Sequence, residues 1–168
     1  EIYNHQELRK IINEKVNIKW KSNSDTETLI NFIENFDIKY VLENLSGMFA
    51  FIVYDYKDDI IYFARDLVGE KPLYFTFNEN YIAIYSDLNP FKKLDFIKKE
   101  INTDSIHSFL KFNYIPTPHT IFQNTFKLRS ASYIKINLKN YDFKSYKSYN
   151  DIKNDKHIVE KKWWNYKD

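Results

Sequence analysis

The sequence contains no cysteine, four prolines and only two glycines, Gly47 and Gly69. Without cysteine the chain can form no disulfide, no thiolate metal site and no cysteine nucleophile of its own. No apolar run approaches the roughly 20 residues that a membrane-spanning helix requires. We therefore expect no membrane partner.

A strong charge of one sign is also missing. The chain has 25 basic and 23 acidic residues, which gives a net charge of +2, and the two signs are interleaved along the sequence. This pattern is typical of a solvated surface, and it disfavours a nucleic-acid partner, which would need a basic patch. No two of the four histidines stand at ligand spacing on one helix face, so we expect no metal site.

What is present indicates a globular chain. Its 168 residues are enough for one domain with a core, or for one domain and a tail. Hydrophobic residues make up 43% and charged residues 29%, as in soluble proteins. Aromatic residues make up 18%, so the core should bury many rings and the phenol groups should need partners.

Apolar side chains recur at helical spacing in the first part of the chain. They predict helices at residues 5–14, in the segment SNSDTETLINFIENF, and at residues 37–44. Asn4 with Glu7, and Ser24 with Glu27, stand at the spacing of a capping box, which predicts how the first two helices begin. Between these helices, residues 17–21 predict a brief strand.

The middle of the chain predicts strands. Residues 48–56 form a continuous apolar stretch, which indicates a strand buried on both faces. Further strands are predicted at residues 60–65, 72–77 and 81–86. The connections between them are short, which favours an antiparallel meander.

The last third is less regular. A helix is predicted at residues 104–112 with Thr103 as its cap, and a strand at residues 132–138 with 143–149 as its hairpin partner. The remaining residues, 150–168, are highly charged, and we interpret them as a linker.

The residues alone indicate little chemistry, because no phosphate-binding glycine loop or nucleophile elbow is present. Asp25 at a helix start is interpreted either as a capping carboxylate or as a group that binds a ligand's ammonium. Arg65 and Asp66 beside Gly69 suggest a structural ion pair around a tight turn. The other polar candidates at element ends are Glu1, Asn4 and Asp87, the last as the cap of a short helix before Pro90.

Several segments nevertheless resemble a known family when they are taken in order: EIYNHQELR, SDTETLI, LSGMFAF, ARDLVGEKPLYF and Ser86-Asp87. They are similar to the glutamine-hydrolysing domain of asparagine synthetases, a class II glutamine amidotransferase of the N-terminal-nucleophile type. The later segments NYIPTPHTIF, FKLRSASYI and KKWWNYKD resemble the continuation toward the ATP-using synthetase domain of that family.

This resemblance implies an α+β fold, namely most of an αββα N-terminal-nucleophile sandwich with largely antiparallel strands. We expect a fragment truncated at both ends. Residues 1–149 would be a partial glutaminase domain whose first strands are missing, which would leave a sheet edge exposed. Residues 150–168 would lead to a missing ATP-dependent synthetase domain. Where relatives have Pro-Pro-Gly, Arg129, Ser130 and Ala131 stand here, and these residues tolerate positive φ poorly.

The resemblance also implies roles for individual residues. The family's glutaminase uses an N-terminal cysteine as nucleophile, its α-amino group as base and an Asn-Gly-Glu run beside the substrate. Glu1 resembles the glutamate of that run, which contacts glutamine, and Asp25 resembles the aspartate that holds the α-ammonium group of glutamine. Arg65, Asp66 and Gly69 would support this pocket from behind. No catalytic residue is expected in this chain, which should be inactive alone.

The implied function is that of a glutamine-dependent, ATP-using asparagine synthetase, in which glutamine supplies ammonia to an aspartate-type carboxylate. No cofactor is expected in this fragment, and ATP and Mg would bind the missing synthetase domain. The resemblance implies a cytoplasmic location and allows a homodimer. Two alternatives stay open: a variant that amidates a sugar acid in surface-polymer biosynthesis, and a non-catalytic glutamine-binding or scaffolding remnant.

Overall fold

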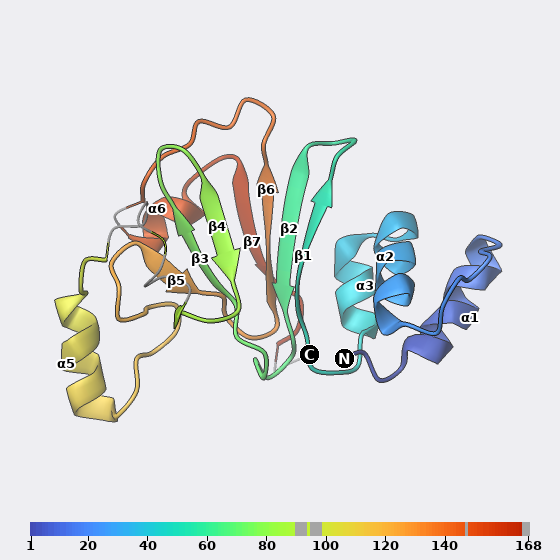
Figure 1. The fold of residues 1–168 in the computed structure, drawn as a ribbon, viewed down its shortest axis with the longest axis horizontal. Helices are drawn as coiled ribbons and strands as arrows, with labels where there is room; N and C mark the ends of the chain where they lie inside the picture. The colour runs from blue at the N-terminus through green and yellow to red at the C-terminus, as the bar shows by residue number, and fades with distance from the viewer. Residues whose placement is uncertain (90–93, 95–98, 147, 166–168) are drawn as a thin grey trace.

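The computed structural model describes residues 1–89, 94, 99–146 and 148–165. Within them the strands form two antiparallel sheets (Figure 1). The larger sheet has the order β1 (Ala50–Asp55), β2 (Ile60–Arg65), β6 (Ser132–Asn137) and β7 (Ile158–Lys162). The smaller sheet has the order β4 (Ile82–Tyr85), β3 (Tyr74–Phe77) and β5 (Thr125–Lys127).

The two sheets enclose one of two apolar cores. Phe63 of β2 and Phe75 of β3 are fully buried, and the centroids of their rings lie 5.2 Å apart. Ile134 and Ile136 of β6 belong to the same cluster. Such packing of apolar inner faces is the usual way in which two sheets form a stable pair.

The second core lies between the larger sheet and three helices: α1 (His5–Lys15), α2 (Asp25–Asn35) and α3 (Ile38–Asn44). The predicted apolar stripes are buried, as Ile12, Phe32 and Leu42 show with an exposed fraction of 0%. The sheet contributes Ala64 and Tyr133 to this cluster. The helix positions predicted from apolar spacing are therefore confirmed.

The capping box predicted for Asn4 and Glu7 is wrong. The side chain of Asn4 makes no cap bond to α1. Its amide nitrogen donates to the carbonyl of Asn44 at 2.8 Å, and its carbonyl accepts from the N–H of Ser46 at 3.0 Å. Asn4 therefore fastens the N-terminal segment to the end of α3, a contact across 40 residues that local spacing does not reveal.

Two strand predictions are also wrong. Residues 17–21 form no strand, and β1 is not buried on both faces. In β1, Ile52 and Tyr54 are 48% and 55% exposed. The reason is the position of β1 at the end of the larger sheet, where its described pairing is with β2 alone.

The C-terminal part folds differently from the prediction. β6 pairs with β2 and β7, not with residues 143–149, and α6 (Tyr149–Lys153) begins where that strand was expected to end. The segment predicted to be a linker returns to the larger sheet as β7, in register Ile134↔Glu160. Burial of Ile152 and Ile158 in the core between the sheets holds it there. A connection to a synthetase domain stays a prediction.

The remaining predictions concern single positions. α5 (Thr103–Phe112) is confirmed, but its cap is Asn102, whose side chain accepts from the N–H of Ser105. Asp87, expected to cap a short helix before Pro90, accepts from the backbone N–H of Asn89 at 3.2 Å, and residues 90–93 lie outside the described part of the chain. Ala131 adopts a φ of 50° and is buried, so this turn keeps a conformation that glycine would adopt more easily. No described helix is long and apolar enough to cross a bilayer.

Candidate functional site

A cavity of about 370 Å³ lies where the N-terminal segment meets the start of α2 and the segment before β1. We call it the Asp25 pocket. Its lining brings together two residues singled out in the sequence, Glu1 and Asp25. Thr26, Phe49, Lys71 and Pro72 are also among its lining residues.

Asp25 is the first residue of α2, and its carboxylate is held in place by the neighbouring chain. Its Oδ2 accepts from the backbone N–H of Ile2 at 2.9 Å. That bond is the main reason why the pKa of Asp25 lies below its ordinary value; the N–H of Thr26 adds to the effect and partial burial opposes it. Asp25 is therefore a fixed negative charge at neutral pH and can bind a ligand's ammonium group.

Glu1 reaches the pocket through a close contact with the chain around Gly47. The carbonyl of Glu1 accepts from the N–H of Met48 at 3.1 Å, and Ile2 forms a β-bridge with Gly47. Because Ile2 is only 4% exposed, its burial anchors this segment in the core of the helical layer. The same anchor presents the N–H of Ile2 to Asp25.

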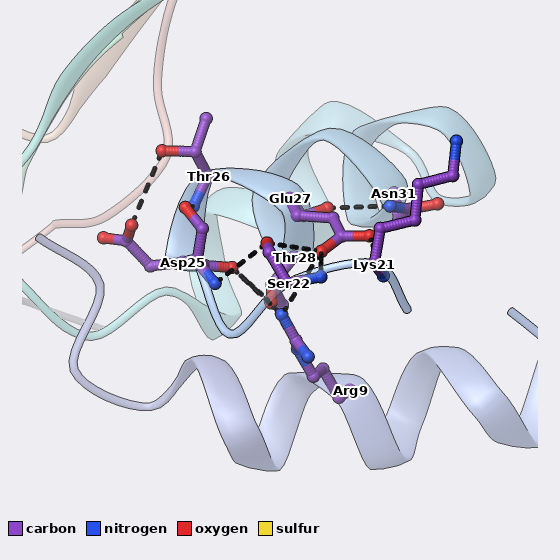
Figure 2. A network of polar contacts seen from close by, with 9 residues as sticks. Arg9, Lys21, Ser22, Asp25, Thr26, Glu27, Thr28 and Asn31 are labelled. Carbon is purple, nitrogen blue, oxygen red and sulfur yellow. Dashed lines mark hydrogen bonds and ion pairs between the residues drawn. The ribbon is translucent and has the colours of Figure 1, made fainter. Parts of the chain in front are cut away.

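An arginine that sequence reasoning missed holds the start of α2. Figure 2 shows the guanidinium of Arg9 pointing from α1 toward α2. It donates to the hydroxyl of Thr28 at 2.8 Å and to the carbonyl of Ser24 at 3.1 Å, and it lies 4.2 Å from the ring centroid of Trp20. The signal in the sequence was an arginine inside the apolar stripe of α1, directly after Leu8.

Glu27 fixes the loop that leads into α2 (Figure 2). Its carboxylate accepts from the backbone N–H groups of Lys21 and Ser22, both at 2.8 Å, and these bonds lower its pKa. The predicted capping box is wrong, because Glu27 binds residues upstream of Ser24. Ser24 does cap the helix, since its hydroxyl accepts from the N–H of Thr26 at 3.1 Å.

Replacing Arg9 by alanine should lower the free energy of unfolding by about 2–3 kcal/mol, because Thr28 Oγ1 and the carbonyl of Ser24 lose a charged, nearly buried donor. Urea denaturation followed by circular dichroism measures this loss. Lys10→Ala changes the exposed neighbour on the same helix and serves as the control. Equal losses in the two variants would contradict the structural role of Arg9.

Asp66 organises the turn after β2. Its carboxylate accepts from four backbone N–H groups: those of Gly69 at 2.6 Å, Glu70 at 2.8 Å, Lys71 at 2.9 Å and Phe49 at 3.3 Å. Asp66 is 1% exposed, so these bonds replace all of its hydration. Two of the donors, Lys71 and Phe49, belong to residues that line the Asp25 pocket.

Arg65 satisfies the other polar groups of this turn. Its guanidinium donates to the carbonyls of Lys71 and Leu128, each at 2.7 Å, and to the carbonyl of Gly69. The structural ion pair expected between Arg65 and Asp66 does not form between these described side chains; each binds backbone groups instead. Arg65, Asp66 and Gly69 do not line the pocket themselves.

The charged residues of the lining indicate which ligands the Asp25 pocket suits. Among the described residues, no three His, Asp or Glu side chains are grouped so that they could hold a metal ion. The lining contains the acidic residues Glu1 and Asp25 and the basic residue Lys71. Such a lining suits a small zwitterionic ligand, although the binding roles of Glu1 and Asp25 stay predictions.

Residues 1–147 match the model of a family described as a glutamine amidotransferase domain. The chain belongs to this family. Two relatives of this amidotransferase domain are glutamine-hydrolysing asparagine synthetases by name. One, from Methanocaldococcus jannaschii, is 31% identical over 164 residues, and the other, from Bacillus subtilis, is 30% identical over 138 residues. These alignments cover 96% and 81% of this chain, but only 31% and 21% of the relatives.

Solved structures confirm the fold of the amidotransferase domain. Glutamine phosphoribosylpyrophosphate amidotransferase from Bacillus subtilis, complexed with ADP and GMP, has a TM-score of 0.55 and 16% identity. The match covers 97% of this chain and 27% of that one. A structure titled as the allosteric regulatory enzyme of purine biosynthesis has a TM-score of 0.53, 18% identity and coverage of 87% and 26%. The expected α+β fold of N-terminal-nucleophile amidotransferases is thus confirmed.

Proposed function

We propose that this chain is the glutamine-binding part of a glutamine-dependent, ATP-using asparagine synthetase. The observation that supports the proposal most directly is the Asp25 pocket in a glutamine amidotransferase domain. There a carboxylate with a lowered pKa stands at the start of a helix beside Glu1. The names of the relatives favour an aspartate-type acceptor over a sugar acid.

In this proposal Asp25 binds the α-ammonium group of glutamine by a charge-assisted hydrogen bond, and Glu1 makes a second polar contact. Cleavage of the glutamine amide requires a nucleophile, a base and an oxyanion hole. This chain has no cysteine, so its own residues bind and orient glutamine but supply no thiol. Alone, the chain binds glutamine without hydrolysing it.

The rest of the proposal concerns the longer parent protein. Its synthetase domain binds ATP and Mg, activates the acceptor carboxylate by adenylation and receives ammonia from glutamine. We place the parent in the cytoplasm, and a homodimer is the assembly to test. The second candidate is a non-catalytic glutamine-binding or scaffolding remnant.

In the parent protein, Asp25→Asn should raise the KM for glutamine about 100-fold and leave the activity with free ammonia unchanged. A charge-assisted bond of about 3 kcal/mol accounts for this factor. Asparagine can still accept the N–H of Ile2, so the fold should survive. Steady-state assays with the two nitrogen donors measure the effect.

Asp104→Asn is the matched control, because Asp104 lies in the first turn of α5 and outside the pocket lining. Equal loss with glutamine and with ammonia would refute the binding role of Asp25. Glutamine binding by the parent without any ammonia release would favour the remnant.

A further inference from the structure

A second cavity of about 530 Å³ lies between helices α2 and α3 and the β1–β2 hairpin. It shares no lining residue with the Asp25 pocket. We call it the Tyr56 groove. Its apolar lining includes Ile30, Ile33, Phe36, Val53, Tyr54 and Tyr56.

Much of this apolar surface is open to solvent. Ile30 is 56%, Tyr54 55% and Tyr56 76% exposed. The ring of Tyr54 is nevertheless held in place, because its hydroxyl donates to the Asp59 carboxylate at 2.9 Å. Exposed apolar side chains that line one groove are a common mark of a binding surface.

The edge of the groove is acidic. Its lining contains Glu34, Asp37, Asp55 and Asp58 but a single cation, Lys57. Asp58 is partly neutralised by Lys139, whose Nζ lies at 3.8 Å.

Glu34, Asp37 and Asp55 form no ion pair with any described residue. Asp37 and Asp55 accept backbone N–H groups of Lys39 and Lys57, both at 2.9 Å, which fixes the positions of their charges.

Two lysines lie near the groove without neutralising these carboxylates. The Nζ of Lys15 lies 4.4 Å from the ring centroid of Phe36 and donates to the carbonyl of Asn35 at the end of α2. The Nζ of Lys135 lies 5.6 Å from the ring centroid of Tyr62. Both contacts show that aromatic rings of this lining already accept cations on their faces.

We propose that the Tyr56 groove is a docking site for a partner protein segment that presents arginine or lysine between apolar side chains. The apolar floor would bury the apolar side chains of the segment. The cationic side chain would lie over a tyrosine ring, within hydrogen-bond reach of Glu34 or Asp55. Charge complementarity selects this partner over an acidic one, because an acidic segment would meet unpaired carboxylates.

The test uses this chain and the synthetic peptide acetyl-Leu-Arg-Trp-Arg-Leu-amide. In a 15N-labelled titration, amide shifts should change at residues lining the Tyr56 groove. The analogue with glutamate in place of arginine should not bind. Raising the salt from about 0.05 to 0.3 M should weaken binding, because screening reduces exposed charge attraction.

The double variant Glu34→Gln/Tyr56→Ser should weaken peptide binding about tenfold, as expected for losing one cation–π contact and one exposed charge contact. The control Glu14→Gln/Tyr114→Ser changes exposed residues outside this lining and should stay within twofold. Unchanged thermal unfolding of both variants shows that the fold is intact.

Three results would overturn the proposal: equal binding of the glutamate analogue, equal affinities of the two double variants, or shifts confined to the Asp25 pocket. Concentration-dependent shifts at the groove without peptide would instead identify a second copy of this chain as the occupant. That result would also refute the proposed partner. None of these outcomes bears on glutamine binding.

Discussion

Replacing Asp66 by alanine is expected to lower the free energy of unfolding by about 3–5 kcal/mol, the cost of breaking a buried, fully bonded charge. The carboxylate accepts four backbone N–H groups in a site that is 1% exposed. Alanine would leave these donors without a partner and would leave the buried guanidinium of Arg65 without its neighbouring negative charge. The free energy of unfolding of a domain of this size is about 5–15 kcal/mol, so Asp66→Ala would remove a large part of it.

Urea denaturation with circular dichroism measures the loss. Asp66→Asn keeps one acceptor oxygen and should lose roughly half as much. Asp58→Ala removes an exposed carboxylate from the β1–β2 turn and should change stability by less than about 0.5 kcal/mol. A loss for Asp66→Ala as small as that for Asp58→Ala would show that the turn does not depend on this carboxylate.

Gly47→Ala is expected to abolish the Asp25 pocket as well as to destabilise the fold. A Cβ at this position would lie 2.2 Å from the carbonyl oxygen of Glu1, and the φ of 150° is one that other residues rarely adopt. Because the contact is with backbone, the Glu1–Ile2 segment has to move away. Ile2 would then lose its buried position and its bond to Asp25.

We expect a loss of about 2–4 kcal/mol, the sum of backbone strain and an exposed isoleucine, and at least tenfold weaker glutamine binding. Calorimetric titration of glutamine and urea denaturation measure the two effects. Ser46→Ala changes the exposed neighbouring residue and should alter neither. If Gly47→Ala left the glutamine affinity unchanged, the Glu1–Ile2 segment would not contribute to glutamine binding.

The helices and most strands followed from the sequence because apolar spacing is a local property. The predicted strand 60–65 coincides with β2, and the three predicted N-terminal helices are present. The errors arose where a distant partner decides the outcome. The prediction for residues 143–149 failed because a later segment, β7, pairs with β6. The prediction of two-sided burial for β1 failed because an apolar run does not reveal that its strand lies at a sheet edge.

The site shows the same division. Asp25 and Glu1 were named from their resemblance to a family motif, and the fold brings both to one cavity. Asn4 and Asp66 make long-range contacts that no local pattern announced. Asn4 binds residues 40 and 42 positions away, and Asp66 binds Phe49 across 17 positions.

The sequence by itself determined the family, the α+β class and the helical positions. Motif order and apolar periodicity are properties of the sequence and need no knowledge of tertiary contacts. Only the tertiary structure decided which charged side chains have hydrogen-bond partners and which groups those partners are. Arg65 and Asp66 are buried neighbours of opposite sign, yet each is neutralised by backbone dipoles. A buried charge needs several well-placed partners at once, and the folded chain alone can supply them.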